Sequence, residues 1–173
     1  FGNINLYYLT GTMQDSMLFI PRDDEAVLWV RKSYERAKAE SDFPVIEKMG
    51  SFRDAAKMYT TLPDTVYLET EIVPLGFYKR FSRHFPFKRA ESLDLDIAMV
   101  RAVKSQFELS LMEKSGRIHE RVLEECVPDM LKEGMRESEL ASSLYTLLVD
   151  EGHHGISRFG SFNTEMLLGQ IGF

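Results

Sequence analysis

Apolar and polar positions alternate along residues 1–104 in short blocks that predict strands and helices in turn. Apolar runs between polar segments predict four short strands: Ser16–Ile20, Ala26–Val30, Val45–Ile46 and Thr65–Glu69. The first two runs flank the polar turn Pro21–Glu25, so they are predicted to be neighbours. A further strand is predicted at Ser92–Val103, where every second residue from Leu93 to Met99 is apolar.

Helical spacing separates these predicted strands. A short helix is expected over about Ser33–Glu40. Ser51 and Asp54 have the Ser-x-x-Asp spacing of a helix start. Pro74 suits the first turn of a further helix, which Pro86 stops. Alternation of this kind predicts an α/β fold, in which helices cover a mixed sheet.

Residues 105–173 show a longer helical period. Apolar side chains recur at helical spacing over about five turns: Phe107, Leu111, Ile118, Val122 and Cys126. Pro128 is expected to kink or restart this helix, and Gly134 to break it.

A second helix and two strands are predicted towards the end of the chain. The helix covers Leu140–Glu151, with Gly152 as a left-handed cap after its last turn. The predicted strands are Ile156–Phe162 and Met166–Ile171, joined by the turn Asn163–Glu165.

The two patterns meet at Ser105. Ser105 and Glu108 have capping-box spacing, in which the hydroxyl accepts from the Glu108 amide and the carboxylate accepts from the Ser105 amide. A sharp helix start here predicts a boundary between a first domain, 1–104, and a second, 105–173. No flexible linker lies between them, which favours a rigid two-part arrangement.

Composition narrows the classes of function. The chain has 173 residues, 44% of them hydrophobic and 28% charged, which is typical of a folded protein and unlike a disordered one. The net charge is −6, so binding to nucleic acid would need a strong local basic patch. No apolar run approaches the roughly 20 residues that span a bilayer, and no signal-peptide pattern opens the chain. Because residue 1 is Phe and not Met, a native start upstream is possible.

The single cysteine, Cys126, argues against an internal disulfide framework and fits a reducing compartment. It lies on the apolar stripe of a predicted helix. A buried structural thiol is therefore favoured over a nucleophile, because no basic residue stands beside it.

Few residues offer a local metal site. His153 and His154 are adjacent and follow Asp150 and Glu151, but neighbouring side chains in a turn diverge, which favours a solvated helix exit. Asp94 and Asp96 are two apart on one face of the predicted strand, where a polar outer surface is the simpler interpretation. His119, in mid-helix, is expected to be partly exposed.

One segment forms the only basic cluster of the sequence: Lys79, Arg80, Arg83, His84, Lys88 and Arg89. One interpretation is a contact with an anionic partner or with another subunit. The other is the solvent face of a helix whose opposite face is aromatic. The negative net charge and the lack of interleaved aromatic residues favour the second interpretation.

Four segments, taken in order, resemble one enzyme family. Asn5–Gly11 is similar to the Asn-Ile-x-Tyr-Leu-Thr-Gly signature of creatinase-like N-terminal domains. Arg101–Glu108 resembles the Arg-x-Ile/Val-Lys-Ser/Thr-x-x-Glu junction that leads into the "pita-bread" catalytic domain. Gly134–Glu137 resembles a Gly-Met-Thr-Glu turn, and Glu151–Ile156 with Arg158 resembles the segment that enters the first catalytic strands. Arg136 departs from the threonine of that turn, which leaves the exact start of the second helix open.

The resemblance implies a relative of the Xaa-Pro dipeptidases and Xaa-Pro aminopeptidases. It implies a creatinase-like N-terminal domain, then the first helices and strands of an α+β pita-bread domain. Such enzymes hold two divalent metal ions (Mn, Co or Zn) with two Asp, one His and two Glu, and these ligands lie downstream of the matched region. No catalytic or metal residue can therefore be carried onto this chain.

The resemblance further implies a cytoplasmic homodimer that acts on short proline-containing peptides, with no nucleic acid and no membrane partner. The chain itself is expected to shape substrate access and dimerisation and to be inactive alone. Two alternatives stay open: a pseudo-peptidase that binds peptide without chemistry, and a creatinase-like amide hydrolase.

Overall fold

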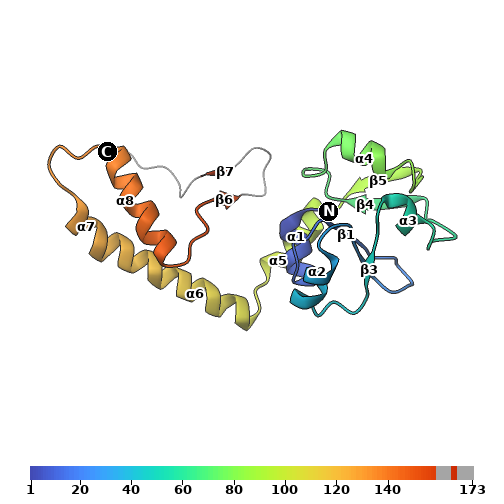
Figure 1. Ribbon diagram of the computed structural model, residues 1–173, viewed down its shortest axis with the longest axis horizontal. Coiled ribbons are helices and arrows are strands. Elements are labelled where there is room, and N and C mark those ends of the chain that lie inside the picture. Colours follow the sequence, from blue (N-terminus) through green and yellow to red (C-terminus); the bar gives the residue numbers. More distant parts are fainter. Residues whose placement is uncertain (159–164, 167–173) are drawn as a thin grey trace. The chain divides into compact units, whose positions relative to one another are not determined.

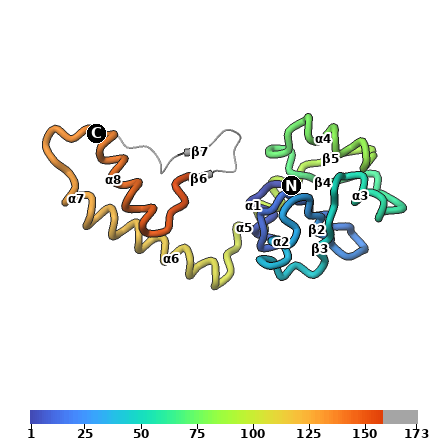
Figure 2. The backbone as a smooth tube through the Cα atoms, in the orientation of Figure 1, coloured from blue at the N-terminus to red at the C-terminus, as the bar shows by residue number. Residues whose placement is uncertain are grey.

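The computed structural model describes residues 1–158 and 165–166 (Figures 1 and 2). The chain divides into two compact units, Phe1–Arg101 and Ala102–Phe173. The first contains both sheet and helix and the second is mainly helical, so each is described by itself.

The first unit contains a three-stranded mixed sheet and a separate parallel pair. The strands are β1 (Ser16–Phe19), β2 (Val27–Val30), β3 (Ile46–Lys48), β4 (Thr65–Leu68) and β5 (Arg89–Ser92). β2 is central in the first sheet, antiparallel to β1 and parallel to β3. β4 and β5 are parallel. The four strands predicted at β1 to β4 are confirmed to within two residues at each end, whereas β5 was not predicted.

Helices alternate with these strands: α1 (Asn3–Thr10), α2 (Tyr34–Glu40), α3 (Phe52–Ala56), α4 (Leu75–Phe81) and α5 (Asp94–Ala102). Parallel strands need a crossover, and α2 connects β2 to β3 as α4 connects β4 to β5. The predicted α/β class is therefore confirmed.

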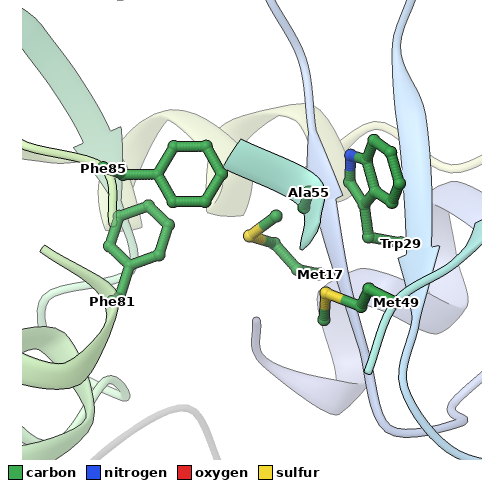
Figure 3. Close-up of a cluster of buried hydrophobic side chains, with 6 residues drawn as sticks. All are labelled: Met17, Trp29, Met49, Ala55, Phe81 and Phe85. Atoms are coloured by element: carbon green, nitrogen blue, oxygen red, sulfur yellow. The ribbon is translucent and has the colours of Figure 1, made fainter. Parts of the chain in front are cut away.

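The core lies on both faces of the first sheet, because successive side chains of a strand point to opposite faces. Leu28 and Val30 of β2 pack with Leu6 of α1 and Ala37 of α2. Trp29 points the other way, into a larger cluster shown in Figure 3: Met17, Trp29, Met49, Ala55, Phe81 and Phe85. The indole nitrogen of Trp29 donates to Tyr59 Oη at 3.1 Å, so its polar atom is satisfied where it is partly buried.

The prediction of a strand at Ser92–Val103 is wrong, since most of this segment is helix α5. Leu93, Ile97 and Arg101 are partly buried and lie four residues apart, whereas Leu95 is 74% exposed. Apolar residues that recur every two positions, as in a strand, also recur every four positions, as on one face of a helix. The alternation alone therefore could not separate strand from helix.

α1 also lay outside the predictions, in which Gly11 was named only as the end of a family signature. Gly11 instead caps a helix in the left-handed region, at φ 77°, and its N–H donates to the Tyr7 carbonyl at 2.8 Å. A residue with a Cβ is disfavoured at this φ, which explains the glycine at the end of the signature.

The second unit begins with a long helix and restarts at a proline. Its described elements are α6 (Gln106–Arg121), a π-helical turn (Val122–Cys126), α7 (Val127–Met130), α8 (Glu137–Asp150), β6 (Ser157–Arg158) and β7 (Glu165–Met166). Pro128 has no N–H to donate, and the π-helical turn lies directly before it, so the predicted restart is confirmed. Gly134 interrupts the helices at φ 78°, as expected. None of the helices in the described part of the chain is long and apolar enough to cross a membrane.

Caps define both long helices. The Glu108 N–H donates to Ser105 Oγ at 3.3 Å and the Ser105 N–H donates to Glu108 Oε2 at 2.8 Å, which is the predicted capping box. At α8 the Arg136 N–H donates to Glu139 Oε2 at 2.8 Å, so the carboxylate half of a box persists without a hydroxyl. The exact start of this second helix, at Glu137, is thereby settled.

The end of α8 follows the prediction. The Gly152 N–H donates to the Val149 carbonyl and the His153 N–H to the Leu148 carbonyl, both at 2.9 Å, with Gly152 at φ 96°. This pattern is a Schellman motif. β6 and β7 pair antiparallel. Ile156 precedes β6, and Glu165 belongs to β7 and not to the predicted turn. Residues 159–162 and 167–171 of the two predicted strands lie outside the described residues.

Candidate functional site

A buried carboxylate links α1 to the end of β4. Glu69 is 6% exposed, and its oxygens accept from the Gly2 N–H at 3.1 Å and from Asn5 Nδ2 at 2.9 Å. The Phe1 nitrogen lies 2.7 Å from Glu69 Oε2. A Cβ on Gly2 would come within 2.8 Å of Glu69 Oε1, so a larger residue at this position would displace the carboxylate.

The other end of Asn5 binds Arg101. Arg101 Nη1 donates to Asn5 Oδ1 at 3.0 Å, across 96 positions of sequence. The guanidinium also lies 5.9 Å from the ring of Tyr8, within cation–π range. Asn5, Glu69 and Arg101, hereafter the Asn5 cluster, therefore bring the first family signature and the junction signature into direct contact.

Electrostatics keep the Glu69 carboxylate ionised. Burial alone would raise its pKa, but the positive Phe1 nitrogen and the hydrogen bonds from Asn5 and Gly2 outweigh burial and hold the pKa below its usual value. Asn5 donates to the carboxylate and accepts from the guanidinium, so it relays between two charged groups. This arrangement fixes the relative positions of the three side chains.

Sequence reasoning named Asn5 and Arg101 only as parts of motifs and missed Glu69. The one available signal was its position, an acidic residue directly after an apolar strand. Such a residue is usually solvated, and nothing local indicates that α1 covers it.

Among the histidines considered as metal ligands, His153 and His119 have other partners. His153 Nδ1 lies 2.8 Å from the Gly155 nitrogen, so it closes the turn after α8. Glu151 pairs with Arg121. His119 Nδ1 lies 2.8 Å from the Ser115 carbonyl within α6, on an exposed face.

Asp94 and Asp96 lie in the first turn of α5 and not on a strand. Asp94 Oδ2 accepts from Thr70 Oγ1 at 2.7 Å and from Ser92 Oγ at 2.8 Å, so it holds the start of the helix. Asp96 is exposed. Across residues 1–158 and 165–166, no three His, Cys, Asp or Glu side chains are grouped to hold a metal ion. The residues described here therefore do not fit a dinuclear metal site.

The basic segment forms a solvent-facing surface on and after α4. Lys79, Arg83 and Arg89 are exposed. Lys88 pairs with Asp64 at 2.9 Å, and Arg80 lies over the Phe77 ring at 5.7 Å. Pairs of this kind at the surface contribute little to the free energy of unfolding.

Cys126 is partly buried at the end of the π-helical turn. The burial expected for a structural thiol is therefore incomplete. Its position on the apolar side of the helix still matches the sequence pattern.

A mixed α/β unit, within which Asn5 binds Arg101, is followed in the sequence by a helical unit, and together they define the class of protein: a two-part chain with a small α/β domain in front. The chain belongs to the creatinase/prolidase N-terminal domain family, whose pattern matches residues 1–103.

Similar proteins extend this likeness beyond residue 103. The Xaa-Pro dipeptidase of Pyrococcus furiosus is 29% identical over 152 residues, covering 86% of this chain and 42% of the relative. An uncharacterized peptidase of Staphylococcus aureus is 26% identical over 175 residues, covering 96% and 48%. The chain therefore spans less than half the length of these relatives.

Solved structures of similar proteins have the same fold over most of this chain. The prolidase of Pyrococcus horikoshii matches with a TM-score of 0.76 and 25% identity, over 88% of this chain and 44% of that one. A Xaa-Pro dipeptidase from Bacillus anthracis matches with a TM-score of 0.78 at 15% identity, over 91% and 45%, which supports the fold alone.

Proposed function

We propose that this chain is the N-terminal part of a Xaa-Pro peptidase, a cytoplasmic homodimer that uses two divalent metal ions to remove a residue that precedes proline. Residues 1–104 form its access-shaping domain, and residues 105–173 form the start of its catalytic domain. Two observations together support the proposal. The similarity to Xaa-Pro dipeptidases continues past residue 103 into the helical unit, and a hydrogen bond joins Asn5 of the first signature to Arg101 of the second.

The part played by this chain is positioning and not chemistry. In a peptidase of this kind the metals activate water and polarise the scissile carbonyl. The described residues supply no grouped ligands for them, so no reaction step is assigned here. The first unit instead limits which peptides reach the metals, and the Asn5 cluster fixes the segment where the chain leaves that unit.

The test compares two polypeptides from the same gene. Purified residues 1–173 are incubated with Mn²⁺ or Co²⁺ and an Xaa-Pro dipeptide, and released proline is measured; no release is expected. The complete gene product is expected to release proline in the same assay, and to leave a matched Xaa-Ala dipeptide intact.

Each alternative has its own outcome. Binding of the dipeptide without cleavage by the complete product would favour a pseudo-peptidase. Cleavage of creatine but not of the dipeptide would favour an amide hydrolase. Proline release by residues 1–173 alone would contradict the proposal.

A further inference from the structure

The chain turns between α8 and β6 (Figure 1), and a histidine side chain closes this turn. The Gly155 N–H donates to His153 Nδ1 at 2.8 Å. A side chain that accepts from the N–H two residues further on is usually Asp or Asn, which makes the contact with its Oδ1. His153 therefore supplies an acceptor that the amide of an Asn could supply equally well, but the imidazole can gain a proton.

The direction of this hydrogen bond fixes the state of the imidazole. A backbone N–H can only donate, so Nδ1 of His153 must present a lone pair, and the hydrogen of the neutral ring lies on Nε2. The charged ring carries hydrogen on both nitrogens and accepts at neither. Protonation of His153 therefore removes the acceptor and places two N–H groups against each other.

His119 of α6 is the opposite case. Its Nδ1 lies 2.8 Å from the Ser115 carbonyl, which can only accept, so this nitrogen carries a hydrogen whether the ring is neutral or charged. Protonation leaves that contact in place. Acid is therefore expected to open the contact of His153 and to spare that of His119.

The turn lies closely against α8. Gly155 is buried, and a Cβ on it would lie 2.9 Å from Tyr145 Oη. A buried N–H that loses its acceptor is costly to leave unpaired. The turn is therefore expected to open when His153 is protonated, two residues before Ser157 begins β6.

Histidine is the residue type that ordinarily changes charge between about pH 5 and 8. The other charged or titratable groups at the turn and on its described neighbours come from α6, the π-helical turn, α8 and the turn itself: Arg121, Glu125, Cys126, Tyr145, Asp150, Glu151 and His154. Of these, Arg121 and Glu151 pair with each other, and His154 is exposed. His153 is the group whose protonation acts directly on Gly155.

We propose that His153 makes the turn into β6 a pH-sensitive latch, which the neutral imidazole closes and its protonation releases. Under the proposed function this latch stands where the chain enters the catalytic strands. Its test needs no enzyme activity, so its failure would leave the proposed function untouched.

Nitrogen-15 NMR of the imidazole rings in residues 1–173 tests the closed state. At pH 8, His153 is expected to carry its hydrogen on Nε2 and His119 on Nδ1. A hydrogen on Nδ1 of His153 at this pH would overturn the proposal, because that ring cannot accept from Gly155.

Hydrogen exchange at the Gly155 amide tests the release, measured as protection relative to an unstructured peptide at the same pH. Protection is expected to fall about tenfold or more between pH 8 and pH 5. His153→Asn keeps an acceptor that does not titrate, so protection should then change by less than about twofold. His154→Asn is the matched control, and its protection should fall as in the unmodified chain.

Several results would contradict the latch. They are a Gly155 amide without protection at pH 8, equal protection at the two pH values, and an equal fall in His153→Asn. A fall of the same size at Leu140, a buried residue of α8, would show acid unfolding of the helix in place of a local release, and would overturn the proposal as well. Because His153→Asn retains the acceptor, the comparison does not depend on a variant that lacks one.

Discussion

Asn5 satisfies two charged groups with one small amide. Glu69 is buried, so a lost donor leaves part of its charge without a partner, and that loss exceeds the net value of an ordinary hydrogen bond. Arg101 loses the hydrogen bond that it donates to Asn5 Oδ1 at the same time.

Replacing Asn5 therefore tests the Asn5 cluster. Asn5→Ala should lower the free energy of unfolding by about 1–3 kcal/mol, measured by urea denaturation. Asn3→Ala is the matched control, since Asn3 is exposed on the same helix, and it should change stability by less than about 0.5 kcal/mol. Equal effects of the two substitutions would show that the cluster adds nothing beyond helix propensity.

Asp94 gives a prediction that depends on pH. Burial raises the pKa of this carboxyl, but hydrogen bonds from Thr70 and Ser92 outweigh burial, and the pKa lies below its usual value. Stability from such a group is present above the unfolded pKa of about 3.9 and is lost as pH falls through the lower folded pKa.

Asp94→Asn should therefore lower the unfolding free energy at pH 7, and the difference from the unmodified chain should shrink below about pH 4. Because Asp94 is largely solvated, the expected loss is about 1 kcal/mol or less. Asp96→Asn, at an exposed position of the same turn, serves as the control. A difference of the same size at pH 3 and pH 7 would rule out the ionised carboxylate as its cause.

At the scale of single residues, the sequence identified Asn5 and Arg101 as parts of signatures but did not predict the contact between them. Motifs name residues one segment at a time, whereas this hydrogen bond joins positions 96 apart. Glu69 carried no local signal, because its burial depends on how α1 packs over the end of β4.

The two long helices of the second unit were predictable because a cap or a glycine marks one end of each. Ser105 bonds Glu108, and the Gly152 N–H bonds the Val149 carbonyl after α8. Both contacts join residues only three apart, so each can be recognised in a short stretch of sequence. α5 was missed because its apolar spacing fits two periods, and the choice is made by packing. β5 was missed because all four of its residues are exposed, which leaves no apolar run to find.

Replacing two glycines of the second unit by alanine should change stability in opposite directions. Gly152 has φ 96°, so Gly152→Ala forces a strained backbone and should destabilise by about 1 kcal/mol. Gly116 lies inside α6 with open space around it, so Gly116→Ala should stabilise by about 0.5–1 kcal/mol. Thermal melting followed by circular dichroism measures both, and a shift of the same sign would contradict the assigned cap.

At the scale of the whole molecule, the two units differ in how much core they contain. The first has two hydrophobic clusters, one on each face of its main sheet. Among the described residues of the second, the buried hydrophobic side chains are Val122 and Leu140. Large apolar side chains of α6 are exposed instead, with Phe107 at 71% and Leu111 at 52%.

This difference predicts how the chain behaves when it is divided at the expected boundary. Residues 1–104 alone should melt in one cooperative transition, because most of the buried apolar surface, which drives folding, belongs to that unit. Residues 105–173 alone should show helical signal but a broad transition, since isolated helices in water are marginal without packing. Circular dichroism of the two polypeptides and of the whole chain makes the comparison. A broad transition in residues 1–104 that sharpens only in the whole chain would mean that the first unit depends on the second for its stability, and the boundary at 104 would then separate parts of one folding unit.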